Sequence, residues 1–376
     1  MDDARRESDP DLGWMRHALE LAERGRFTVS PNPLVGCVLV RDGVMVGGGW
    51  HERAGGPHAE VAALADAGDQ AQGATAYVTL EPCAHTGRTG PCTDALVAAG
   101  VQRVVYALPD PNPLAAGGGE RLRKAGLDVQ GGVGQELAAR QNEVFLHVLR
   151  TGRPFVTVKA ALSVDGRLAA ADGTSKWLTG EQARTQAHAL RAEADAVIVG
   201  SGTVLADDPA LTVRRYDYGG PQPLRVVLDG RGRTPVTSKV LDSAAPTLIA
   251  VSDQASAQAI AVLETAGAEV VSLPADRQGG GVQPRALLQT LARRGVCSVL
   301  VEGGAQVAAG FLREGHWDRL VVHVAAVLLG AEGQPLQLGE AVTTLAEAPR
   351  LRLDDVAKVG DDVVLTYRPL KSVQEA

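Results

Sequence analysis

The sequence predicts an α/β protein of two domains, the first an α/β/α sandwich and the second an α/β domain with a mixed sheet. The chain has 376 residues, more than a single hydrophobic core usually organises. Apolar runs of strand length alternate with segments of helical spacing along most of it. Near the middle, Arg150-Thr151-Gly152-Arg153-Pro154 has the composition of a short linker. We therefore expect domains over residues 12–149 and 155–376, joined by residues 150–154.

The first domain is expected to follow a disordered tail, residues 1–11, which is acidic and polar. After the tail, Trp14, Ala18 and Leu21 recur at helical spacing. Asp42-Gly43 is typical of a hairpin turn between two apolar runs. The predicted elements are a helix over 12–24, strands over 35–40, 44–49, 75–80 and 101–107, helices that open near His58 and Cys92, and a long helix over 135–149.

The second domain begins with an apolar run at Phe155 and closes with two strands joined across Gly360-Asp361. Thr179 is expected to cap a helix, with Gln182 at the reciprocal position of a capping box. The predicted strands cover 155–162, 196–200, 224–229, 298–301, 352–356 and 363–367, and the predicted helices cover 180–194 and a segment that ends near 313.

Charge and composition argue against a nucleic-acid or membrane partner. The formal net charge is −7, so no basic surface for a polyanion is expected. The N-terminal segment lacks the apolar core of a signal peptide, and no apolar stretch free of charges reaches membrane-spanning length. Cys37 and Cys297 lie within apolar runs and are expected to be buried thiols in a reducing compartment. A cytoplasmic protein is the resulting prediction.

His58-Ala59-Glu60, Pro82-Cys83 and Cys92 follow the order of residues in zinc-dependent deaminases. One imidazole and two thiolates would hold Zn²⁺ in three tetrahedral positions and leave the fourth for water. Glu60 would carry a proton from that water to the departing ammonia. The alternative is that both cysteines are ordinary buried side chains. The zinc interpretation is favoured because these residues end a strand-like run or open helix-like runs, where α/β folds place their sites.

Eight residues separate Cys83 from Cys92, where the common deaminase pattern has two. The inserted loop places Arg88 among glycines, and its residue types fit a phosphate contact and a solvated loop equally well. Asn32 lies between two prolines, and His51 follows the second predicted strand. Both are candidates to contact a base, although Asn beside Pro is also ordinary turn chemistry.

Val301-Glu302-Gly303-Gly304 is the end of a buried strand that breaks into a glycine-rich turn before a helix. The N–H groups at such a helix start suit a phosphate, although a tight turn alone explains the same residues. No G-x-G-x-x-G lies between a strand and a helix, so a standard Rossmann dinucleotide domain is not expected.

The chain resembles a family of bifunctional enzymes of riboflavin biosynthesis, in which a pyrimidine deaminase is fused to a ribosyl reductase. The resemblance covers nearly all of the chain outside the tail, and the long loop between the cysteines is typical of the family. It rests on ordered motifs in both halves: Pro31-Asn32-Pro33-x-Val35-Gly36, His58-Ala59-Glu60, Glu81-Pro82-Cys83-x-His85-x-Gly87-Arg88-Thr89-x-Pro91-Cys92, Asp110-Pro111-Asn112-Pro113, Ser163-x-Asp165-Gly166, Leu205-Ala206-Asp207-Asp208-Pro209-x-Leu211-Thr212 and Val301-Glu302-Gly303-Gly304.

This resemblance implies a cytidine-deaminase-like sandwich followed by a dihydrofolate-reductase-like domain. It implies hydrolytic removal of an amine from 2,5-diamino-6-(5-phospho-ribosylamino)pyrimidin-4-one at zinc. NADPH-dependent reduction of the ribosyl group of 5-amino-6-(5-phosphoribosylamino)uracil to a ribityl chain would follow. Zn²⁺ and NADPH are the implied cofactors, a phosphorylated pyrimidine is the implied partner, and a homodimer through the reductase domain is the implied assembly.

The resemblance also implies roles for single residues. In the first domain, Asn32, His51 and Arg88 would contact the pyrimidine or the phosphate. In the second, Lys159 and Asp207 would lie at the reacting sugar, with Lys159 the better candidate for the proton donor. The implied substrate residues are Ser175, Arg191, Leu211, Arg214 and Glu302, and the implied NADPH residues are Ala161, Trp177, Thr203, Asp207 and the turn from Gly304 through Ala305 to Gly310.

Some of these positions have a second interpretation. Arg191 also fits a solvated helix face, and Trp177 also fits a hydrophobic core. Gly230 stands where some relatives have a serine, which puts that side-chain contact to the cofactor in question. The run Gly117-Gly118-Gly119 also departs from the family's usual pattern.

Two rival functions remain open from the sequence. One is a stand-alone nucleoside or tRNA deaminase with an unrelated second domain, which the acidic balance of charge disfavours. The other is a zinc module without activity whose second domain binds a nucleotide. The presence of Glu60 argues against that module, because a structural zinc site needs no proton carrier.

Overall fold

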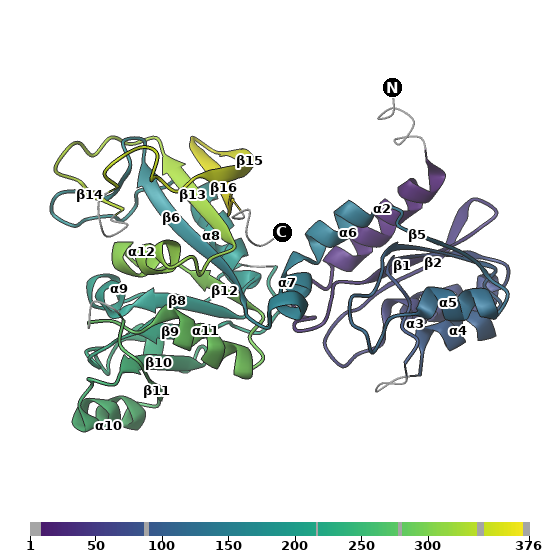
Figure 1. Cartoon of the computed structure of the whole chain (residues 1–376), viewed down its shortest axis with the longest axis horizontal. Coiled ribbons are helices and arrows are strands. Elements are labelled where there is room, and N and C mark those ends of the chain that lie inside the picture. Colours follow the sequence, from purple (N-terminus) through teal and green to yellow (C-terminus); the bar gives the residue numbers. More distant parts are fainter. Residues whose placement is uncertain (1–8, 86–89, 216, 277–279, 337–341, 371–376) are drawn as a thin grey trace. The chain divides into compact units, whose positions relative to one another are not determined.

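The computed structural model describes residues 9–85, 90–215, 217–276, 280–336 and 342–370. Within these ranges the chain divides into two compact units, one up to Gly152 and one from Arg153 onward. No helix in the described ranges is long and apolar enough to cross a membrane. Figure 1 shows an α/β arrangement in each unit, which confirms the predicted fold class.

The first unit is built on a five-stranded mixed sheet in the order β2-β1-β3-β4-β5. The first strand of the chain, β1, runs antiparallel to β2 and β3, whereas β3, β4 and β5 are parallel. The parallel strands therefore end at one edge, where α/β sheets place their sites. The strands are β1 Gly36–Arg41, β2 Val44–Trp50, β3 Thr75–Leu80, β4 Arg103–Leu108 and β5 Asp128–Gly131.

Helices cover both faces of this sheet (Figure 1). Successive side chains of a strand point to opposite faces. Accordingly, Cys37 and Leu39 of β1 pack on one side, and Val38 and Val40 pack on the other. The first side is covered by α3 Ala59–Ala67, α4 Cys92–Ala98 and α5 Gly118–Lys124, and the second by α2 Pro10–Glu23 and α6 Gln135–Gln141; a 3-10 helix spans Gly68–Ala71.

The first helix begins inside the segment predicted to be a disordered tail. The Asp9 carboxylate caps it by accepting from the Asp11 N–H at 3.0 Å. The Asp11 carboxylate in turn lies 2.7 Å from a guanidinium nitrogen of Arg103 and accepts from the Tyr77 hydroxyl at 2.7 Å. The predicted tail is therefore too long, because these contacts with β3 and β4 order its last residues.

The helix predicted over 135–149 is two helices, α6 and α7 Glu143–Thr151, that meet at Asn142. The buried Asn142 amide accepts from the Leu34 N–H at 2.7 Å and donates to the Leu34 carbonyl at 2.9 Å. Asn142 departs from helical geometry, with φ −102° and ψ 23°. The second helix also runs into the predicted linker, so it ends only shortly before the strand that begins at Phe155.

The second unit contains a nine-stranded sheet in the order β11-β10-β9-β8-β12-β6-β13-β16-β15. Its neighbours are parallel from β11 to β13, and the closing hairpin β15–β16 is antiparallel, as predicted. The strands are β6 Phe155–Ser163, β8 Ala196–Gly200, β9 Leu224–Leu228, β10 Thr247–Ser252, β11 Glu269–Leu273, β12 Ser298–Val301, β13 Arg319–Ala325, β15 Leu351–Val359 and β16 Asp362–Pro369; β7 Arg167–Ala169 and β14 Gln334–Pro335 form a separate small sheet.

Helices pack on both faces of this second sheet as well. Leu287, Leu291 and Phe311 pack against one face, and Val204 and Leu263 pack against the other. The helices are α8 Glu181–Ala192, α9 Ser201–Asp207, α10 Ala257–Thr265, α11 Pro284–Arg293 and α12 Ala305–Arg313, with a 3-10 helix over Lys239–Leu241.

The prediction that Thr179 caps the helix after it is wrong. Gly180 is the capping residue of α8, and no side chain of the local segment caps it. Instead, the Gly180 N–H donates to the carboxylate of Asp362 at 2.8 Å, and the Thr179 carbonyl accepts from Arg184 at 2.7 Å. A carboxylate from β16 thus replaces the local capping box.

Cys37 and Cys297 are buried free thiols, as predicted. Burial, followed by the nearby Glu60 carboxylate, raises the pKa of the Cys37 thiol well above its ordinary value. The protonated thiol is therefore a small apolar side chain of the first core.

Candidate active sites

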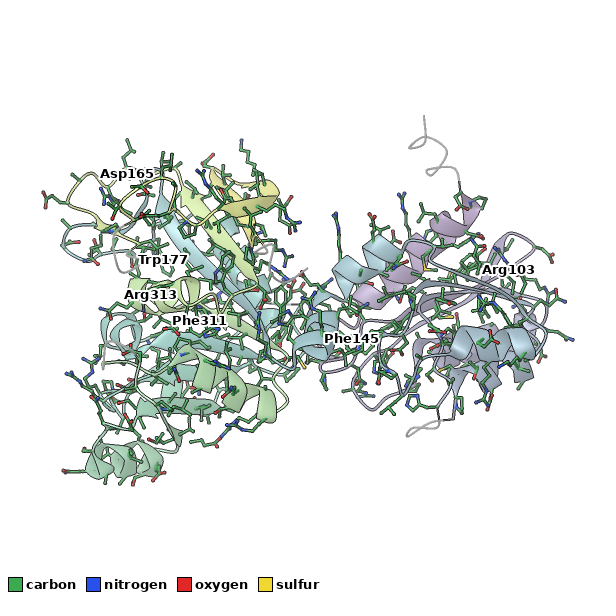
Figure 2. All side chains as sticks on the ribbon, viewed as in Figure 1. Arg103, Phe145, Asp165, Trp177, Phe311 and Arg313 are labelled. Atoms are coloured by element: carbon green, nitrogen blue, oxygen red, sulfur yellow. The ribbon has the colours of Figure 1, made fainter. Side chains whose placement is uncertain are left out.

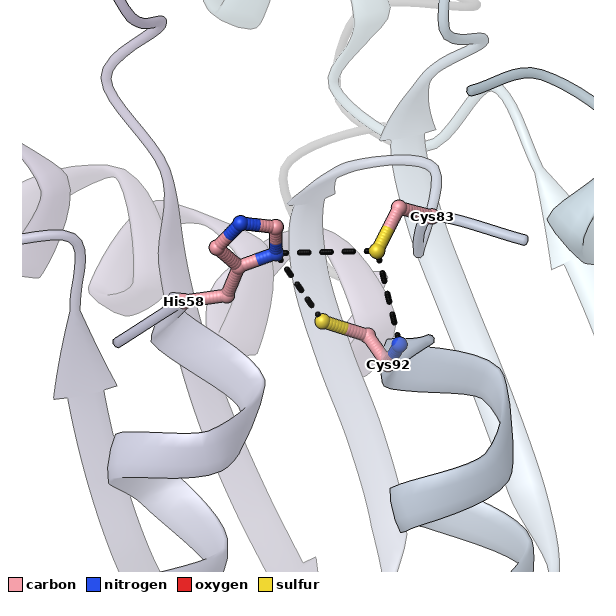
Figure 3. Close-up of side chains that lie close together, drawn as sticks. All are labelled: His58, Cys83 and Cys92. Carbon is pink, nitrogen blue, oxygen red and sulfur yellow. Dashed lines mark hydrogen bonds between the residues drawn. The ribbon is translucent and has the colours of Figure 1, made fainter. Parts of the chain in front are cut away.

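The predicted zinc ligands lie together at one end of the first sheet. His58 directly precedes α3, Cys83 follows β3, and Cys92 is the first residue of α4 (Figure 3). Their ligand atoms all lie within 4.8 Å of one another. The His58 Nδ1 atom is 3.1 Å from the Cys92 Sγ atom and 3.6 Å from the Cys83 Sγ atom. One imidazole and two thiols around a common point are the donor set of a catalytic zinc site with an open fourth position.

The protonation of this cluster also fits a divalent cation. Hydrogen bonding from Cys92, followed by that from His58, holds the pKa of the Cys83 thiol far below its usual range. Sharing a proton with Cys83, together with burial, raises the pKa of the Cys92 thiol. Zinc binding would leave both sulfurs deprotonated, because coordinated thiols are thiolates.

Glu60 lies in the first turn of α3 and is 3% exposed. Burial raises the pKa of this carboxyl above its ordinary value, which eases protonation. Glu60, His58 and Cys83 line one cavity of about 540 Å³. A carboxyl that accepts and releases a proton beside a metal site is suited to general acid–base catalysis.

The predicted base-contacting residues Asn32 and His51 line the same cavity. The Asn32 Nδ2 atom is 2.9 Å from the His51 Nε2 atom, and the His51 Nδ1 atom is 2.9 Å from the Pro57 carbonyl oxygen. An amide N–H only donates and a carbonyl only accepts, so His51 is neutral with its proton on Nδ1. Burial agrees, because it lowers the pKa of His51. The predicted phosphate contact Arg88 lies outside the described residues.

Sequence reasoning missed several side chains of this cavity. The Glu81 carboxylate accepts from the Asp110 N–H at 3.1 Å and from the Gly119 N–H at 2.8 Å, which holds the loop after β4 beside the site. Asp110 and Asn112 line the cavity. The motif Asp110-Pro111-Asn112-Pro113 was a usable signal, because it follows a parallel strand at its carboxyl end.

Two further features are harder to predict from the sequence. Phe145 of α7 lines the cavity, but its sequence context is that of any amphipathic helix and does not indicate a site. The glycine run that departs from the family pattern is explained by packing. A Cβ atom on Gly118 would lie 1.7 Å from the Pro82 carbonyl oxygen, so only glycine allows α5 to start against the Pro82-Cys83 segment.

In the second unit, two predicted substrate residues are paired with each other. Arg191 at the end of α8 makes a bidentate, buried ion pair with Glu302 after β12, with Nη2–Oε2 at 2.6 Å and Nε–Oε1 at 2.8 Å. Burial would raise the pKa of Glu302, but Arg191 and then Lys159 outweigh that effect and hold it below its usual value. Burial also lowers the pKa of Lys159, which Glu302 opposes. The three residues thus form one charged cluster at neighbouring strands β6 and β12.

Arg214, also predicted to bind substrate, lies beside His188. Its Nη2 atom is 3.5 Å from the His188 Nε2 atom. Burial, followed by the charges of Arg191 and Arg214, lowers the pKa of His188 to about 4. Arg191 is neutralised by Glu302, whereas no carboxylate among the described residues forms an ion pair with Arg214. This corner therefore suits a bound anion.

The predicted cofactor residues Ala161, Thr203 and Gly304 lie on or after the neighbouring strands β6, β8 and β12. Gly304 donates its N–H to the Thr203 hydroxyl oxygen at 3.0 Å, which joins the start of α12 to α9. Ala161 lies two residues after Lys159 in β6, so both point to the same face. The predicted turn from Gly304 to Gly310 is corrected, because Ala305 begins α12 and Gly310 lies within it.

The remaining predicted residues differ in accessibility. Ser175 is exposed, and Trp177 is 74% exposed, with the Arg184 guanidinium 4.7 Å from its ring centroid. Figure 2 labels Trp177 in the second unit. Asp207 ends α9 and pairs with Lys176 at 3.4 Å. A core position for Trp177 is therefore wrong.

Leu211 is 2% exposed, and its side chain packs in the core under β8 and β9. It has φ +53°, a left-handed backbone conformation that is uncommon for a leucine. A predicted contact between Leu211 and substrate would therefore have to come from its backbone. At Gly230, a Cβ atom would lie 2.6 Å from the Gly280 carbonyl oxygen, so a serine does not fit this backbone.

Comparisons with known proteins agree with this division. Residues 8–108 match the family described as cytidine and deoxycytidylate deaminase zinc-binding region, and residues 154–365 match the RibD C-terminal domain. The riboflavin biosynthesis protein RibD of Escherichia coli is 43% identical over 94% of this chain and 98% of its own length. The protein of the same name from Aquifex aeolicus is 42% identical over 95% of this chain and 98% of its own length.

Solved structures match the chain along the length of both units. Acinetobacter baumannii RibD matches with a TM-score of 0.85 and 44% identity, covering 96% of this chain and 99% of that protein. A Thermotoga maritima diaminohydroxyphosphoribosylaminopyrimidine deaminase/5-amino-6-(5-phosphoribosylamino)uracil reductase matches with a TM-score of 0.85 and 34% identity, covering 96% of this chain and 99% of that protein. The chain therefore belongs to the RibD family and is a bifunctional enzyme of riboflavin biosynthesis, a zinc-dependent deaminase followed by an NADPH-dependent reductase.

Proposed function

We propose that the first unit removes the 2-amino group of 2,5-diamino-6-(5-phospho-ribosylamino)pyrimidin-4-one by hydrolysis. The second unit then reduces the ribosyl group of 5-amino-6-(5-phosphoribosylamino)uracil to a ribityl chain. The observation that carries the proposal is the His58, Cys83 and Cys92 cluster with Glu60 in one cavity. The related Thermotoga maritima enzyme bears the names of both activities at 34% identity.

For the deamination, the metal ligands, Glu60 and Asn32 have proposed roles. His58, Cys83 and Cys92 would hold the zinc ion, which would supply a water activated for attack near neutral pH. Glu60 takes a proton at its carboxylate and delivers it to the departing amine, which its raised pKa supports. Because the Asn32 Nδ2 atom binds His51, its amide oxygen is left to accept from an N–H group of the pyrimidine.

For the reduction, the charged cluster of β6 and β12 is the proposed reaction site. Bound NADPH would supply the hydride that reduces the sugar C1 atom, and the bond from C1 to the ring oxygen would break. We assign the proton that this oxygen takes to the Lys159 ammonium group, whose pKa is lowered by burial. We assign Asp207 to the reacting sugar, Arg214 to the substrate phosphate and Ser175 to substrate binding.

The proposed assembly is a homodimer through the reductase unit. Its support is the exposed edge strand β15, where Leu351, Leu353 and Val356 are 38%, 51% and 54% exposed. Exposed edge strands are available for pairing with a second chain. The proposed location is the cytoplasm, where the thiolate ligands stay reduced. Light scattering on purified protein tests the dimer, and a monomer mass would contradict it.

The function is tested by assaying the two steps separately, with zinc quantified in the same preparation. Purified protein with the diamino substrate alone should release ammonia, and with the deaminated product and NADPH it should oxidise NADPH. A preparation that contains zinc but releases no ammonia would contradict the first assignment. Failure to oxidise NADPH with the deaminated product would contradict the second.

A further inference from the structure

We propose that His323 of β13 is a positioning residue for the reduction: its Nδ1 atom accepts a hydrogen bond from the Lys159 ammonium group and keeps that group protonated and aimed at the reacting sugar. The inference rests on the proposed function, in which Lys159 gives its proton to the ring oxygen of the sugar. His323 neither gives nor takes this proton, and its role is to hold the donor.

The two side chains lie on the same face of neighbouring strands. In the second sheet β13 is beside β6 (Figure 1), and the two strands run parallel. In their register His323 lies opposite Ala161, which comes two residues after Lys159 in β6. Side chains two residues apart in a strand point to the same face, so the three residues share one face.

The spacing of the strands puts the imidazole within reach of the lysine. Strands lie about 4.8 Å apart and two residues advance the chain by about 6.6 Å, so the Cα atoms of Lys159 and His323 are roughly 8 Å apart. Lysine carries its ammonium on a flexible four-carbon stem, which crosses that distance to an imidazole that leans toward it. The methyl group of Ala161, opposite His323, leaves the space above it open.

Lys159 has a carboxylate on one flank and His323 on the other. β12 is the other neighbour of β6, and by continuation of its register Glu302 follows that strand opposite Lys159. The Glu302 carboxylate is already held by the Arg191 guanidinium, at 2.6 and 2.8 Å. No hydrogen bond or ion pair joins the Lys159 ammonium to the residues that the structure describes. A partly buried ammonium needs an acceptor, and His323 offers one.

His323 presents a free acceptor to this face. The residue is 1% exposed, and its Nε2 atom is 3.2 Å from the Gln186 Oε1 atom. An amide oxygen only accepts, so Nε2 carries the proton of a neutral ring and Nδ1 is left as an acceptor. Burial, followed by the charge of Lys159, lowers the pKa of His323 to about 4, which keeps the ring neutral at pH 7. Within the described part of the chain, no hydrogen bond reaches Nδ1.

The contact between Gln186 and His323 is a polar pair inside the interface of α8 with the sheet. Gln186 comes three residues after the buried Ala183 and four before Leu190, which packs on the core, so its side chain faces the sheet. Two apolar side chains would fill this space without removing polar groups from water. The pair is explained if Gln186 serves to fix the tautomer of His323 that faces Lys159.

Charged groups act on this imidazole from three strands: Lys159 of β6, Glu302 after β12 and Asp362 of β16. Glu302 is neutralised by Arg191 of α8, which also acts on Lys159, and Asp362 caps the start of α8. A hydrogen bond to the charged form of a group raises its pKa. Removing the Nδ1 acceptor should therefore lower the pKa of Lys159 further than burial already does.

The test uses two amide substitutions, each of which keeps the place of one ring nitrogen. The amide oxygen of asparagine is two bonds from Cβ, as Nδ1 is, and that of glutamine is three bonds from Cβ, as Nε2 is. His323→Asn therefore keeps an acceptor beside Lys159 and loses the contact with Gln186. His323→Gln keeps the contact with Gln186 and loses the acceptor.

The pKa of Lys159 is a readout that requires neither cofactor nor turnover. Full-length protein is labelled with ¹³C at the lysine Cε atoms, and NMR follows the signals of its six lysines against pH. Lys159→Met identifies the signal of Lys159. His323→Gln should lower the pKa of Lys159 by about one unit, the usual contribution of a hydrogen bond to a charged group. His323→Asn should leave this pKa close to that of wild type.

Turnover and stability are measured on the same variants. In NADPH oxidation with the deaminated product, the alkaline limb of the kcat profile should move to lower pH by about one unit in His323→Gln, with the KM for NADPH unchanged. Thermal unfolding should rank the variants the other way, because His323→Asn leaves Gln186 without its partner and should have the lower Tm.

His316→Gln is the matched control. His316 lies before the start of β13, at the opposite end from His323, and its Nε2 atom is 3.8 Å from the Glu314 carboxylate. This variant should match wild type in the pKa of Lys159 and in the kcat profile.

Three results would overturn the inference: an unchanged pKa of Lys159 in His323→Gln, equal losses of this pKa in both amide variants, or a raised KM for NADPH without a shift in the pKa. The second would assign His323 a purely structural role, and the third a contact with the cofactor. Failure of wild type to oxidise NADPH contradicts the proposed function instead, and the NMR titration still reports on the contact between His323 and Lys159.

Discussion

His51 and Asn32 show how single side chains prepare the deaminase cavity before any ligand binds. The Pro57 carbonyl fixes the proton of His51 on Nδ1, and His51 then fixes which end of the Asn32 amide points into the cavity. Substrate binding should therefore lose little conformational entropy at these two side chains, because their polar atoms are already oriented. Glu60, the proposed proton carrier, is buried and lines the same cavity as His58 and Cys83.

Replacing Glu60 with glutamine should therefore lower the rate of ammonia release by roughly 10²–10⁴-fold, the usual contribution of a positioned acid–base group. Oxidation of NADPH with the deaminated product should remain unchanged, because that reaction uses the second unit. Glu120→Gln, an exposed residue of α5 paired with Lys124, is the control and should deaminate normally. Normal ammonia release by the Glu60 variant would refute the proposed mechanism.

Arg191 and Glu302 show why a charged residue's role is hard to assign from its type. From the sequence, Arg191 fits either a phosphate contact or a solvated helix face. In the structure, Arg191 and Glu302 instead neutralise each other in a buried ion pair. A buried carboxylate between Arg191 and Lys159 keeps both cations close to the reaction site without net repulsion. Arg214 remains the stronger candidate for the substrate phosphate.

Among the helices and strands, the start of α8 shows a tertiary contact replacing a local one. The Asp362 carboxylate of β16 accepts from the Gly180 N–H, whereas the hydroxyl of Thr179 makes no capping bond. Thr179→Ala should therefore change the free energy of unfolding by less than about 0.5 kcal/mol. Asp362→Ala should lower it by about 1–2 kcal/mol, because a helix N–H loses its acceptor.

Urea unfolding monitored by circular dichroism measures both effects. Equal losses in the two variants, or a larger loss for Thr179→Ala, would mean that the local capping box operates in solution.

The break between α6 and α7 has the same origin. The spacing of apolar residues over 135–149 predicts helix, and α6 and α7 occupy nearly all of that range. The break at Asn142 arises because its amide bonds both backbone groups of Leu34, far away in sequence. Helix propensity alone does not predict this break, because the polar partners of Asn142 belong to the segment before β1.

For the molecule as a whole, the two units make the activities separable. Removing zinc with a chelator should abolish ammonia release and leave NADPH oxidation intact, because His58, Cys83 and Cys92 all belong to the first unit. Adding back zinc should restore deamination. Loss of NADPH oxidation on chelation, with recovery on zinc addition, would show that the second unit depends on the metal.

The second unit should also lose stability in mild acid. Burial lowers the pKa of His323 to about 4, with nearby Lys159 acting in the same direction, and the pKa of His188 is also about 4. An unfolded histidine titrates near 6.5, so between about pH 6.5 and 4 the unfolded chain binds protons that the folded chain does not. The free energy of unfolding should therefore fall as the pH falls through this window and be greatest above it.

Urea unfolding of the second unit at several pH values measures this slope. His323→Gln, which can still donate to the Gln186 side chain, should make the slope shallower. An unchanged slope in this variant would mean that His323 is not the source of the acid sensitivity.

Much of the molecule follows from the sequence because the signals are local. Strand and helix periodicity, the zinc ligands at element boundaries and the closing hairpin depend on residues near one another in the chain. The long loop between Cys83 and Cys92 distinguishes this family from other deaminases. Arg88 of that loop lies outside the described residues, so its role stays a prediction.

Tertiary structure alone decided which distant groups meet. It paired Arg191 with Glu302, gave the start of α8 the carboxylate of Asp362, and broke the helix at Asn142 to bind Leu34. It also joined the loop after β9 to the first turn of α9 through Arg233 and Ser201. The physical reason is the same in each case: a buried polar group must find a partner, and folding, rather than sequence spacing, determines which partner lies within hydrogen-bonding distance.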